Sequence, residues 1–324
     1  MSKIKWGVLG TADIARGCTI PGMQQADNCE LYAIAGRSME KAQLFKEQFG
    51  FEKAYGSYDE LLCDENVQAV YIPLPNHLHL EWTLKALRAK KHVLCEKPMA
   101  MNAKETEEMF CCAKENGVLL MEAFAYLHSP IVSAVKDELQ NIGPVTYMES
   151  AFVTSDYSME NIRMHREFFG GGMYDLGCYT VSQILWMMGE EPQTVQAIAT
   201  FTPENVDNFA TGVMTFKNGA KAHFTCGMAL PTNQFRRLDR FHIHGLKGSL
   251  RSNVCFNQEG DLSYAVTLNG NTEEKTVFSP QNYRLEVEQL GRCILGGEQP
   301  HVSEKFSLML SRTMDRILSA MGYN

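Results

Sequence analysis

Two short segments of the sequence combine residue types that could handle a proton. His92–Pro98 is an apolar run that ends in Glu96, Lys97 and a proline. Gly170–Tyr179 begins with three glycines and places Asp175 and Tyr179 four residues apart, which is one face of a helix. A lysine can polarise a reacting oxygen, and neighbouring charge can favour an ionised tyrosine. The alternative is an exposed lysine, a capping aspartate and a packed tyrosine.

A third segment has the residue types of a nucleotide-binding turn. Gly10, Thr11, Ala12, Asp13 and Ile14 follow the first apolar run and form a variant of the GxGxxG/A fingerprint, with alanine as its middle glycine. Small residues let the backbone approach a pyrophosphate, and the following helix start supplies N–H donors and a positive dipole end. An ordinary tight strand-to-helix connection is the alternative.

The second apolar run ends without the carboxylate that NAD-specific sites place there. Gly36, Arg37 and Ser38 occupy this position. A guanidinium and a hydroxyl favour a 2′-phosphate, so NADP(H) is the preferred cofactor and NAD(H) the alternative. Arg37 as an ordinary surface cation is the competing interpretation.

The elements that must position these residues alternate between strand and helix up to about residue 123. Apolar runs predict strands, and helical periodicity lies between them, with Ser57 as an N-cap. The predicted strands are Ile4–Leu9, Leu31–Ala35, Val70–Ile72, His92–Cys95 and Val118–Met121, and the clearest helices are Leu80–Ala89 and Ala103–Asn116. This order predicts a parallel sheet with helical crossovers.

After residue 123 the pattern becomes mostly strand. A helix over Ser129–Gln140 precedes alternating segments with turn signals at Lys217–Gly219 and Asn269-Gly270, and two helices end the chain. The predicted strands are Val145–Phe152, Val195–Phe201, Ala210–Phe216, Ala220–Cys226, Phe241–His244 and Tyr264–Leu268. The predicted fold is α/β, with a Rossmann domain over 1–123 and an α/β domain over 124–324 built on a large, mostly antiparallel open sheet.

Composition excludes several classes of protein. With 38 acidic and 30 basic residues the net charge is −8, and no basic block offers a surface to nucleic acid or to anionic membranes. No membrane span or signal peptide is predicted, so a cytoplasmic location with reduced cysteines is expected. His242 and His244 share a strand face, but no third ligand is near in sequence, so no metal site is predicted.

Four segments resemble the glucose-fructose oxidoreductase and inositol dehydrogenase family across essentially the whole chain. They are Gly10–Ala15, Pro73–His79, Glu96–Pro98 and Gly171–Tyr179. The dihydrodiol and D-xylose dehydrogenase branch is the most similar, because Tyr179 stands where inositol dehydrogenases have histidine. The resemblance implies a Rossmann domain and a second domain whose open sheet covers the active site and mediates assembly into a homodimer or homotetramer.

The resemblance also implies roles for individual residues. Lys97 matches the catalytic lysine that contacts cofactor and substrate, Tyr179 the acid/base and Asp175 its acidic partner. Arg163 resembles a segment beside the substrate. The residues expected at the cofactor besides the glycine turn and Arg37-Ser38 are Leu74, Asn76, His79 and Glu96. Weaker substrate candidates are Asp156, Tyr157 and Asn233.

The sequence therefore predicts reversible hydride transfer between nicotinamide C4 and a carbinol or carbonyl carbon of a sugar, polyol or vicinal diol. The expected cofactor exchanges freely. One competing hypothesis is a redox-neutral enzyme that recycles the hydride through a keto-sugar during glycoside cleavage or epimerisation. The other is a non-catalytic sensor of nucleotide or metabolite, against which the combination of Lys97, Asp175 and Tyr179 argues.

Overall fold

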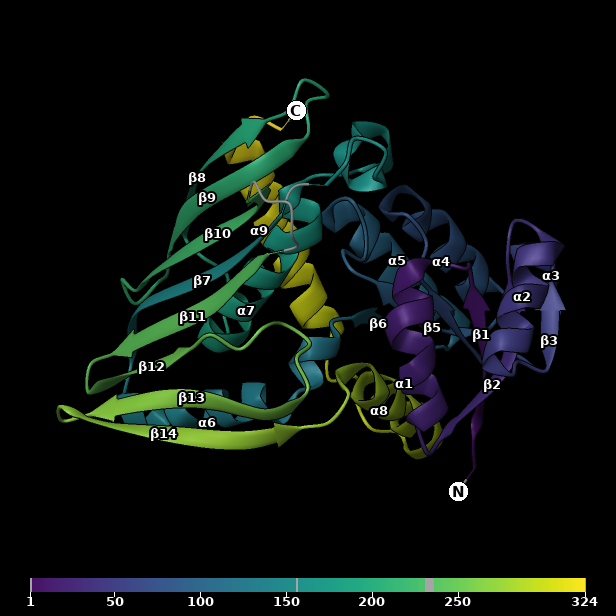
Figure 1. Cartoon of the computed structure of the whole chain (residues 1–324), viewed down its shortest axis with the longest axis horizontal. Coiled ribbons are helices and arrows are strands. Elements are labelled where there is room, and N and C mark those ends of the chain that lie inside the picture. Colours follow the sequence, from purple (N-terminus) through teal and green to yellow (C-terminus); the bar gives the residue numbers. More distant parts are fainter. Residues whose placement is uncertain (1, 156, 231–235, 324) are drawn as a thin grey trace. The chain divides into compact units, whose positions relative to one another are not determined.

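The computed structural model describes residues 2–155, 157–230 and 236–323. The chain forms two compact units (Figure 1). One contains Met1–His128 together with Pro280–Ser307, and the other contains Ser129–Ser279 together with Leu308–Asn324. The sequence predicts one domain boundary at residue 123, which assigns Pro280–Ser307 to the second domain. In the structure this segment packs with the first unit.

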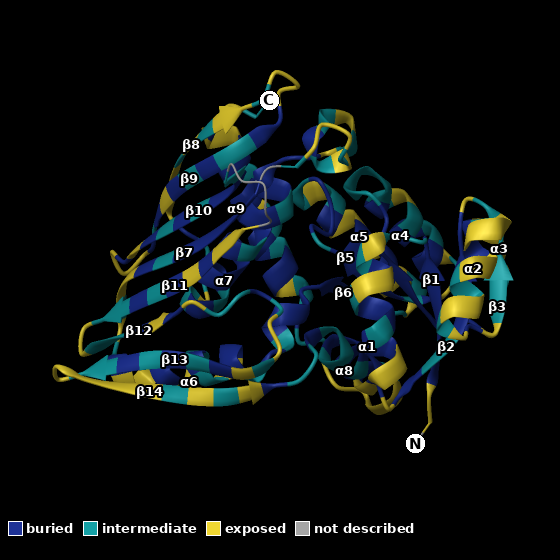
Figure 2. Cartoon of the chain, in the orientation of Figure 1, coloured by how far each residue is buried: buried dark blue, intermediate teal, exposed yellow. Residues whose placement is uncertain are grey.

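The first unit is built on a six-stranded parallel sheet in the order β3-β2-β1-β4-β5-β6, the order of a doubly wound dinucleotide-binding fold. Its central strands are apolar and buried over nearly their whole length (Figure 2), as expected where helices cover a parallel sheet. The strands are β1 (Ile4–Leu9), β2 (Cys29–Ala35), β3 (Lys53–Tyr55), β4 (Ala69–Ile72), β5 (His92–Glu96) and β6 (Leu120–Ala123). The helices are α1 (Ile20–Gln25), α2 (Met39–Phe49), α3 (Tyr58–Cys63), α4 (His79–Arg88), α5 (Ala103–Asn116) and the late α8 (Asn282–Gly296).

Helix α8 belongs to the first unit because it packs tightly against α1. A Cβ on Gly22 of α1 would lie 2.7 Å from the backbone nitrogen of Arg284, so only glycine allows this approach. The side chain of Gln281 donates to the Cys18 carbonyl (3.0 Å), and that of Asn28 donates to the Glu288 carbonyl (2.8 Å). These contacts fix α8 to residues more than 250 positions earlier in the chain.

The second unit contains an eight-stranded sheet in the order β14-β13-β12-β11-β7-β10-β9-β8. β7 and β10 run parallel, and the other paired strands run antiparallel. The predicted combination of a Rossmann domain with a mostly antiparallel α/β domain is therefore confirmed. The strands are β7 (Val145–Ser155), β8 (Thr194–Phe201), β9 (Asp207–Thr215), β10 (Lys221–Leu230), β11 (Arg237–Gly245), β12 (Gly248–Ser252), β13 (Gly260–Leu268) and β14 (Asn271–Ser279).

Helices cover one face of this sheet. α6 (Pro130–Ile142) and α7 (Cys178–Met188) lie along the same side of the strands in Figure 1. Ser150 of β7 donates to Gln183 of α7 (2.6 Å), and Lys275 of β14 forms an ion pair with Glu138 of α6. The last helix, α9, runs from Glu304 to Ala320. None of the helices in the described residues is long and apolar enough to cross a membrane.

Candidate active site

The turn after β1 has the backbone shape that an anion site requires. Gly10 has φ +125°, a conformation that favours glycine, and a Cβ there would lie 3.0 Å from Cδ2 of Leu74. Its N–H donates to the Ala35 carbonyl at the end of β2 (2.9 Å). A helix begins at Asp13 and continues through a π-helical turn, Ala15–Thr19, and the side chain of Ile14 before this turn makes no capping bond. The N–H groups and the positive dipole end of this helix start suit a phosphate.

The remaining residues of the predicted fingerprint lie on this turn. Thr11 and Ala12 are half-buried, and Asp13 is exposed and forms an ion pair with Arg16 one helical turn later. Because Asp13 already has a cationic partner, its carboxylate adds little negative charge to the helix start.

Arg37 lies close to the same turn. It is exposed directly after β2, and Ser38 precedes α2. Burial raises the pKa of the Tyr58 hydroxyl, and the positive charge of Arg37 lowers it in part. A Cβ on Gly10 would lie 3.8 Å from this hydroxyl. Tyr58 therefore has the glycine turn and the Arg37 guanidinium as neighbours.

Lys97 follows β5 at the carboxyl edge of the sheet, the edge at which Gly10 follows β1 and Arg37 follows β2. The side chain of Glu96 points into the protein. Its Oε1 accepts from the Tyr71 hydroxyl (2.6 Å), which itself accepts from Thr19 (2.9 Å), and its Oε2 accepts from the Lys97 N–H (3.2 Å). This network anchors the backbone beneath Lys97.

His79 connects the loops that follow β4 and β5. It is fully buried, and its ring nitrogens lie 2.8 Å from the carbonyls of Pro98 and Leu74. Burial lowers its pKa. Asn76 begins a 3₁₀ turn just before it and is half-buried. His79 and Glu96 thus brace the sheet edge, and direct contact of either side chain with a cofactor stays a prediction.

In the second unit, the segment with Asp175 and Tyr179 forms one continuous helical stretch. A π turn, Met173–Gly177, leads directly into α7. Between Gly171 and Thr180 only Asp175 and Tyr179 are not buried, which confirms that they share the open face of the helix. Asp175 Oδ2 accepts from Arg163 Nε at 2.7 Å, and this carboxylate raises the pKa of Arg163. The two residues form an ion pair.

Asp207, the first residue of β9, fixes the start of this helix. Its Oδ2 accepts from the Met173 N–H at 2.7 Å. Gly171 has φ +122°, and a Cβ there would lie 2.2 Å from Asp207 Oδ1, so the glycine is required both by the turn and by the carboxyl group. Burial raises the pKa of Asp207 to about 7. No local pattern marks Asp207 as a site residue, because its partner lies 34 residues away.

The surroundings of Tyr179 also come from distant parts of the sequence. Its ring centroid lies 5.5 Å from that of Phe152 and 5.1 Å from that of Phe256, and the Asn257 amide donates to its hydroxyl at 3.4 Å. None of these three residues was expected at the site. They join β7 and the β12–β13 connection to α7.

Arg163 also contacts another predicted residue, because its guanidinium lies 5.3 Å from the ring centroid of Tyr157. Asp156 and Asn233 lie outside the described residues. The rings of His242 and His244 are 4.3 Å apart. Among the described side chains, no group of three or more His, Cys, Asp or Glu residues could hold a metal ion.

Comparisons with known proteins give the same assignment for both parts of the chain. Residues 4–124 match the model of an oxidoreductase family with an NAD-binding Rossmann fold, and residues 137–251 match the C-terminal domain of the same family. D-xylose 1-dehydrogenase (NADP(+)) 2 of Haloferax volcanii is 35% identical, over 96% of this chain and 95% of that protein. Trans-1,2-dihydrobenzene-1,2-diol dehydrogenase of Xenopus laevis is 29% identical, over 98% of each.

A solved structure is similar over nearly the whole chain. The 3-ketoreductase KijD10 of Actinomadura kijaniata, in complex with NADP and TDP-benzene, superposes with a TM-score of 0.92 at 29% identity, covering 99% of this chain and 98% of that one. Together with the two family matches, this shows that the chain belongs to the GFO/IDH/MocA family of oxidoreductases with an NAD-binding Rossmann fold.

Proposed function

We propose that this oxidoreductase uses NADP(H) to interconvert a carbinol and a carbonyl group on a sugar, polyol or vicinal diol. The observation that carries the proposal is the open face of the helix at Gly171–Thr180, where Asp175 and Tyr179 are the only residues that are not buried. The names of relatives support the substrate class, since they include a D-xylose dehydrogenase, a dihydrodiol dehydrogenase and a 3-ketoreductase of Actinomadura kijaniata.

The first unit has the residues to hold the cofactor. We assign the pyrophosphate to the turn at Gly10–Ile14, because its helix start is uncapped. We assign the 2′-phosphate to Arg37 and Ser38, because an exposed guanidinium next to a hydroxyl pairs well with a phosphate. The loops with Leu74, Asn76, His79 and Glu96 would support the nicotinamide ribose. When bound, the cofactor supplies or accepts the hydride.

Side chains of the protein transfer the proton of the reacting hydroxyl. Oxidation of a carbinol leaves a hydroxyl proton to be removed, and Tyr179 is the proposed base, or the acid in the reverse direction. Lys97 donates to the reacting oxygen and stabilises negative charge that develops there. Asp175, held ionised by Arg163, accepts a hydrogen bond from a substrate hydroxyl and orients it.

The first test is binding followed by turnover on the same sample. NADPH and NADH are titrated by fluorescence, and a panel of aldoses, polyols and diols is then followed by the absorbance of the reduced nicotinamide. Turnover by the wild type is expected to fall about 1,000-fold in Lys97→Ala and Tyr179→Phe, which remove a proton-handling group. Lys104→Ala, which alters an exposed residue elsewhere, is the matched control.

The outcomes separate the competing hypotheses. Turnover that survives both substitutions would overturn the assigned roles. Product formation without any change in absorbance would replace net oxidation with recycling of the hydride. Binding of either dinucleotide without reaction across the panel would favour a sensor.

Cofactor preference is tested at Arg37. Arg37→Ala removes a charge-assisted bond to the 2′-phosphate, so NADPH affinity should fall about 10-fold or more while NADH affinity changes little. Equal losses for the two cofactors would place Arg37 away from the 2′ position. Lys41→Ala, on the following helix, is the control.

We also propose that the chain assembles as a homo-oligomer through the sheet of the second unit. Register places five large apolar or aromatic side chains on the face opposite α6 and α7, with exposures between 37% and 72%. They are Tyr147, Ile198, Val213, Leu238 and Phe278. They lie on strands from β14 at one edge of the sheet to β8 at the other, so this face exposes apolar side chains across its width, as a subunit interface does.

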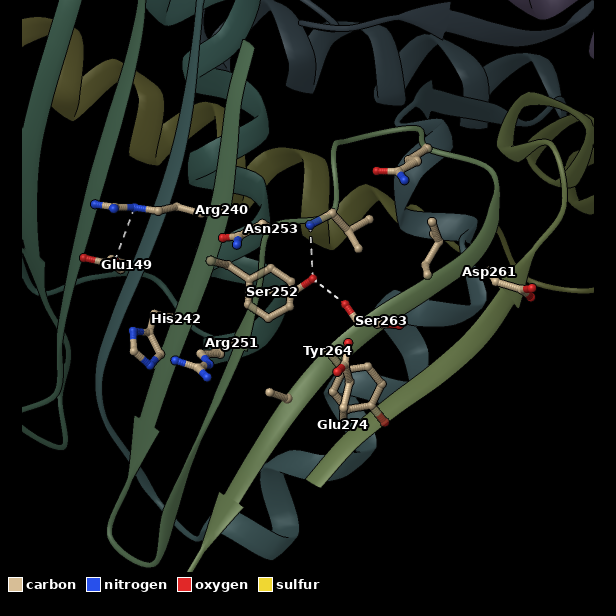
Figure 3. A pocket seen from close by; sticks show the side chains of 15 residues that line it. Glu149, Arg240, His242, Arg251, Ser252, Asn253, Asp261, Ser263, Tyr264 and Glu274 are labelled. Carbon is tan, nitrogen blue, oxygen red and sulfur yellow. Dashed lines mark hydrogen bonds and ion pairs between the residues drawn. The ribbon is translucent and has the colours of Figure 1, made fainter. Parts of the chain in front are cut away.

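The same sheet also has a groove of about 800 Å³, lined largely by polar and charged side chains that a second subunit would pair with. Figure 3 shows charges of both signs along its strands, including the Glu149–Arg240 ion pair, Arg251 and Glu274. Sedimentation of Ile198→Glu and Phe278→Glu tests the proposal, and both variants should sediment as smaller species than the wild type. Unchanged sedimentation would remove this face from the interface.

A further inference from the structure

The connection between β12 and β13 brings Phe256 and Asn257 to Tyr179. Phe256 is 7% exposed, and its ring stacks on Phe152 at 5.2 Å with 24° between the planes. Asn257 has φ +62°, a backbone conformation that asparagine tolerates better than most residues. This conformation accompanies the approach of its amide to the Tyr179 hydroxyl.

An ion pair between half-exposed Arg237 and buried Asp239 holds this connection in place. Both oxygens of the Asp239 carboxylate bond the guanidinium of Arg237, with Nη2 2.6 Å from Oδ1, and the Asp239 side chain is 1% exposed. The same two residues bind the backbone of Phe256. Asp239 Oδ1 accepts from its N–H (3.0 Å), and Arg237 Nη2 donates to its carbonyl (3.0 Å).

Strand register places the pair on the same side of the sheet as Tyr179. Asp239 is opposite Phe152 across the β7–β11 ladder, and the Arg237 guanidinium lies 4.3 Å from the Phe152 ring centroid. Phe152 and Phe256 contact the Tyr179 ring, so the pair fixes both of its aromatic neighbours. A buried carboxylate and its paired guanidinium that both bond one backbone residue make a rigid clamp.

We propose that Asn257 is a positioning residue for Tyr179: held by the Arg237–Asp239 clamp, its amide N–H fixes the phenolic oxygen and favours the phenolate over the phenol. The inference rests on the proposed role of Tyr179 as acid/base. A donor stabilises a phenolate more than a phenol, because a hydrogen bond to a charged oxygen is the stronger one. At 3.4 Å the bond is long, as catalytic hydrogen bonds often are before substrate is bound.

Charged groups lie near Tyr179 as well as the amide. Arg163 and Arg237 both interact electrostatically with Tyr179, and Asp175 lies one helical turn before it. Each arginine has its own carboxylate partner, Asp175 or Asp239, so much of its field is cancelled. The amide of Asn257 donates directly to the phenolic oxygen.

A spectroscopic titration tests the proposal without substrate. The ultraviolet tyrosinate signal of the full chain is measured against pH, and the Tyr179 component is the part that Tyr179→Phe removes. Asn257→Gly keeps the positive φ but removes the donor, so the midpoint of this component should rise by about one pH unit. Asn269→Gly is the matched control, because Asn269 also has a positive φ, at the β13–β14 turn.

Asn257→Asp adds a second, nearly isosteric test. It replaces the donor with a negative charge, so the midpoint should rise further than in Asn257→Gly. Under turnover, the pH limb of kcat should move with the midpoint, while the KM for the sugar changes less.

The possible results are distinguishable. If the midpoint is the same in wild type, Asn257→Gly and Asn257→Asp, the positioning role is overturned. If the midpoint moves but Tyr179→Phe retains full turnover, the contact with Asn257 stands and the acid/base role of Tyr179 falls. Equal shifts in Asn257→Gly and Asn269→Gly would mark a general effect of the substitution and would also overturn the proposal.

Discussion

The starts of two helices, one in each unit, invite comparison. Each follows a glycine with nearly the same backbone conformation, φ +125° at Gly10 and φ +122° at Gly171. Each then opens with a π-helical turn, Ala15–Thr19 in the first unit and Met173–Gly177 in the second. The wide turn is uncommon in proteins and is often found at functional sites.

The two helix starts differ in what meets their N–H groups. In the first unit no described side chain caps the turn. In the second, the Asp207 carboxyl group lies at the N–H of Met173 and against Gly171. The same local geometry can thus receive an external anion or be filled by the protein's own carboxyl group. The open start suits a cofactor that exchanges, and the filled start suits a helix whose side chains must stay in place.

The largest effect is expected from filling the open start. Ala12→Asp places a carboxylate where the pyrophosphate is proposed to bind, and the repulsion should weaken NADPH binding about 100-fold. Fluorescence titration measures the loss. Asn269→Asp makes a comparable charge change in the other unit and should leave binding unchanged. If Ala12→Asp binds NADPH normally, this helix start does not hold the phosphates.

Removing the Asp207 carboxyl group from the helix start at Met173 should lower the free energy of unfolding. Asp207→Ala leaves the Met173 N–H buried without its acceptor, so the free energy of unfolding should fall by about 2 kcal/mol. Urea denaturation followed by circular dichroism measures it. NADPH affinity is expected to be unaffected, because Asp207 belongs to the second unit. A variant as stable as the wild type would show that the carboxyl group is dispensable as a cap.

The pH dependence of unfolding sharpens the comparison further. Burial raises the pKa of Asp207 to about 7, whereas an unfolded aspartate titrates near pH 4, so the folded chain binds the additional proton between these values. The contribution of Asp207 to the free energy of unfolding is therefore complete below about pH 4. It is lost as the pH rises through 7, and the free energy of unfolding falls by about 1 kcal/mol per pH unit in between. Asp207→Asn should remove this slope.

Glu122 is the internal control for that measurement. It lies in the first unit, and burial raises its pKa to about 7 as well. The share of the pH dependence due to Glu122 should survive in Asp207→Asn and disappear in Glu122→Gln. Identical pH profiles for wild type and Asp207→Asn would mean that Asp207 stays ionised in the folded chain.

The smallest effect is expected at Tyr323, which bonds Asp207 and whose hydroxyl also lies 3.4 Å from the Gly170 carbonyl. Tyr323→Phe removes these bonds but keeps the ring against Tyr174 and Phe201, so the loss should be about 0.5 kcal/mol. Thermal unfolding of this variant and of Tyr147→Phe provides the comparison. A loss as large as that of Asp207→Ala would make Tyr323 essential to the cap.

Local patterns were sufficient to predict much of the fold. Ile4–Leu9 and Ala103–Asn116 have the predicted bounds, and Ser57 caps α3 by accepting from the Glu60 N–H. Three short or polar strands were missed, the first being β3, which has only three residues. β14 begins Asn-Thr-Glu-Glu-Lys, a charged edge strand without apolar alternation, and β12 has only five residues.

The site was only partly predictable for a different reason. Asp175 and Tyr179 could be paired because helical spacing is local. Asn257 meets Tyr179 across 78 positions, and Asp207 meets Met173 across 34. Contacts of this kind depend on which strands become neighbours in the sheet, and no spacing in a single sequence records that.

Because α8 packs with the first unit, the first unit cannot be completed during translation until α8 has been synthesised. All six strands of the parallel sheet have emerged by Ala123, yet the surface of α1 around Gly22 stays uncovered until Arg284 has been synthesised. The eight strands of the other sheet are translated in the interval. A nascent chain arrested at residue 279 should therefore be cleaved by protease around α1 faster than the full chain. The parallel-sheet unit would thus begin to fold first but be completed only after the eight-stranded sheet has been synthesised.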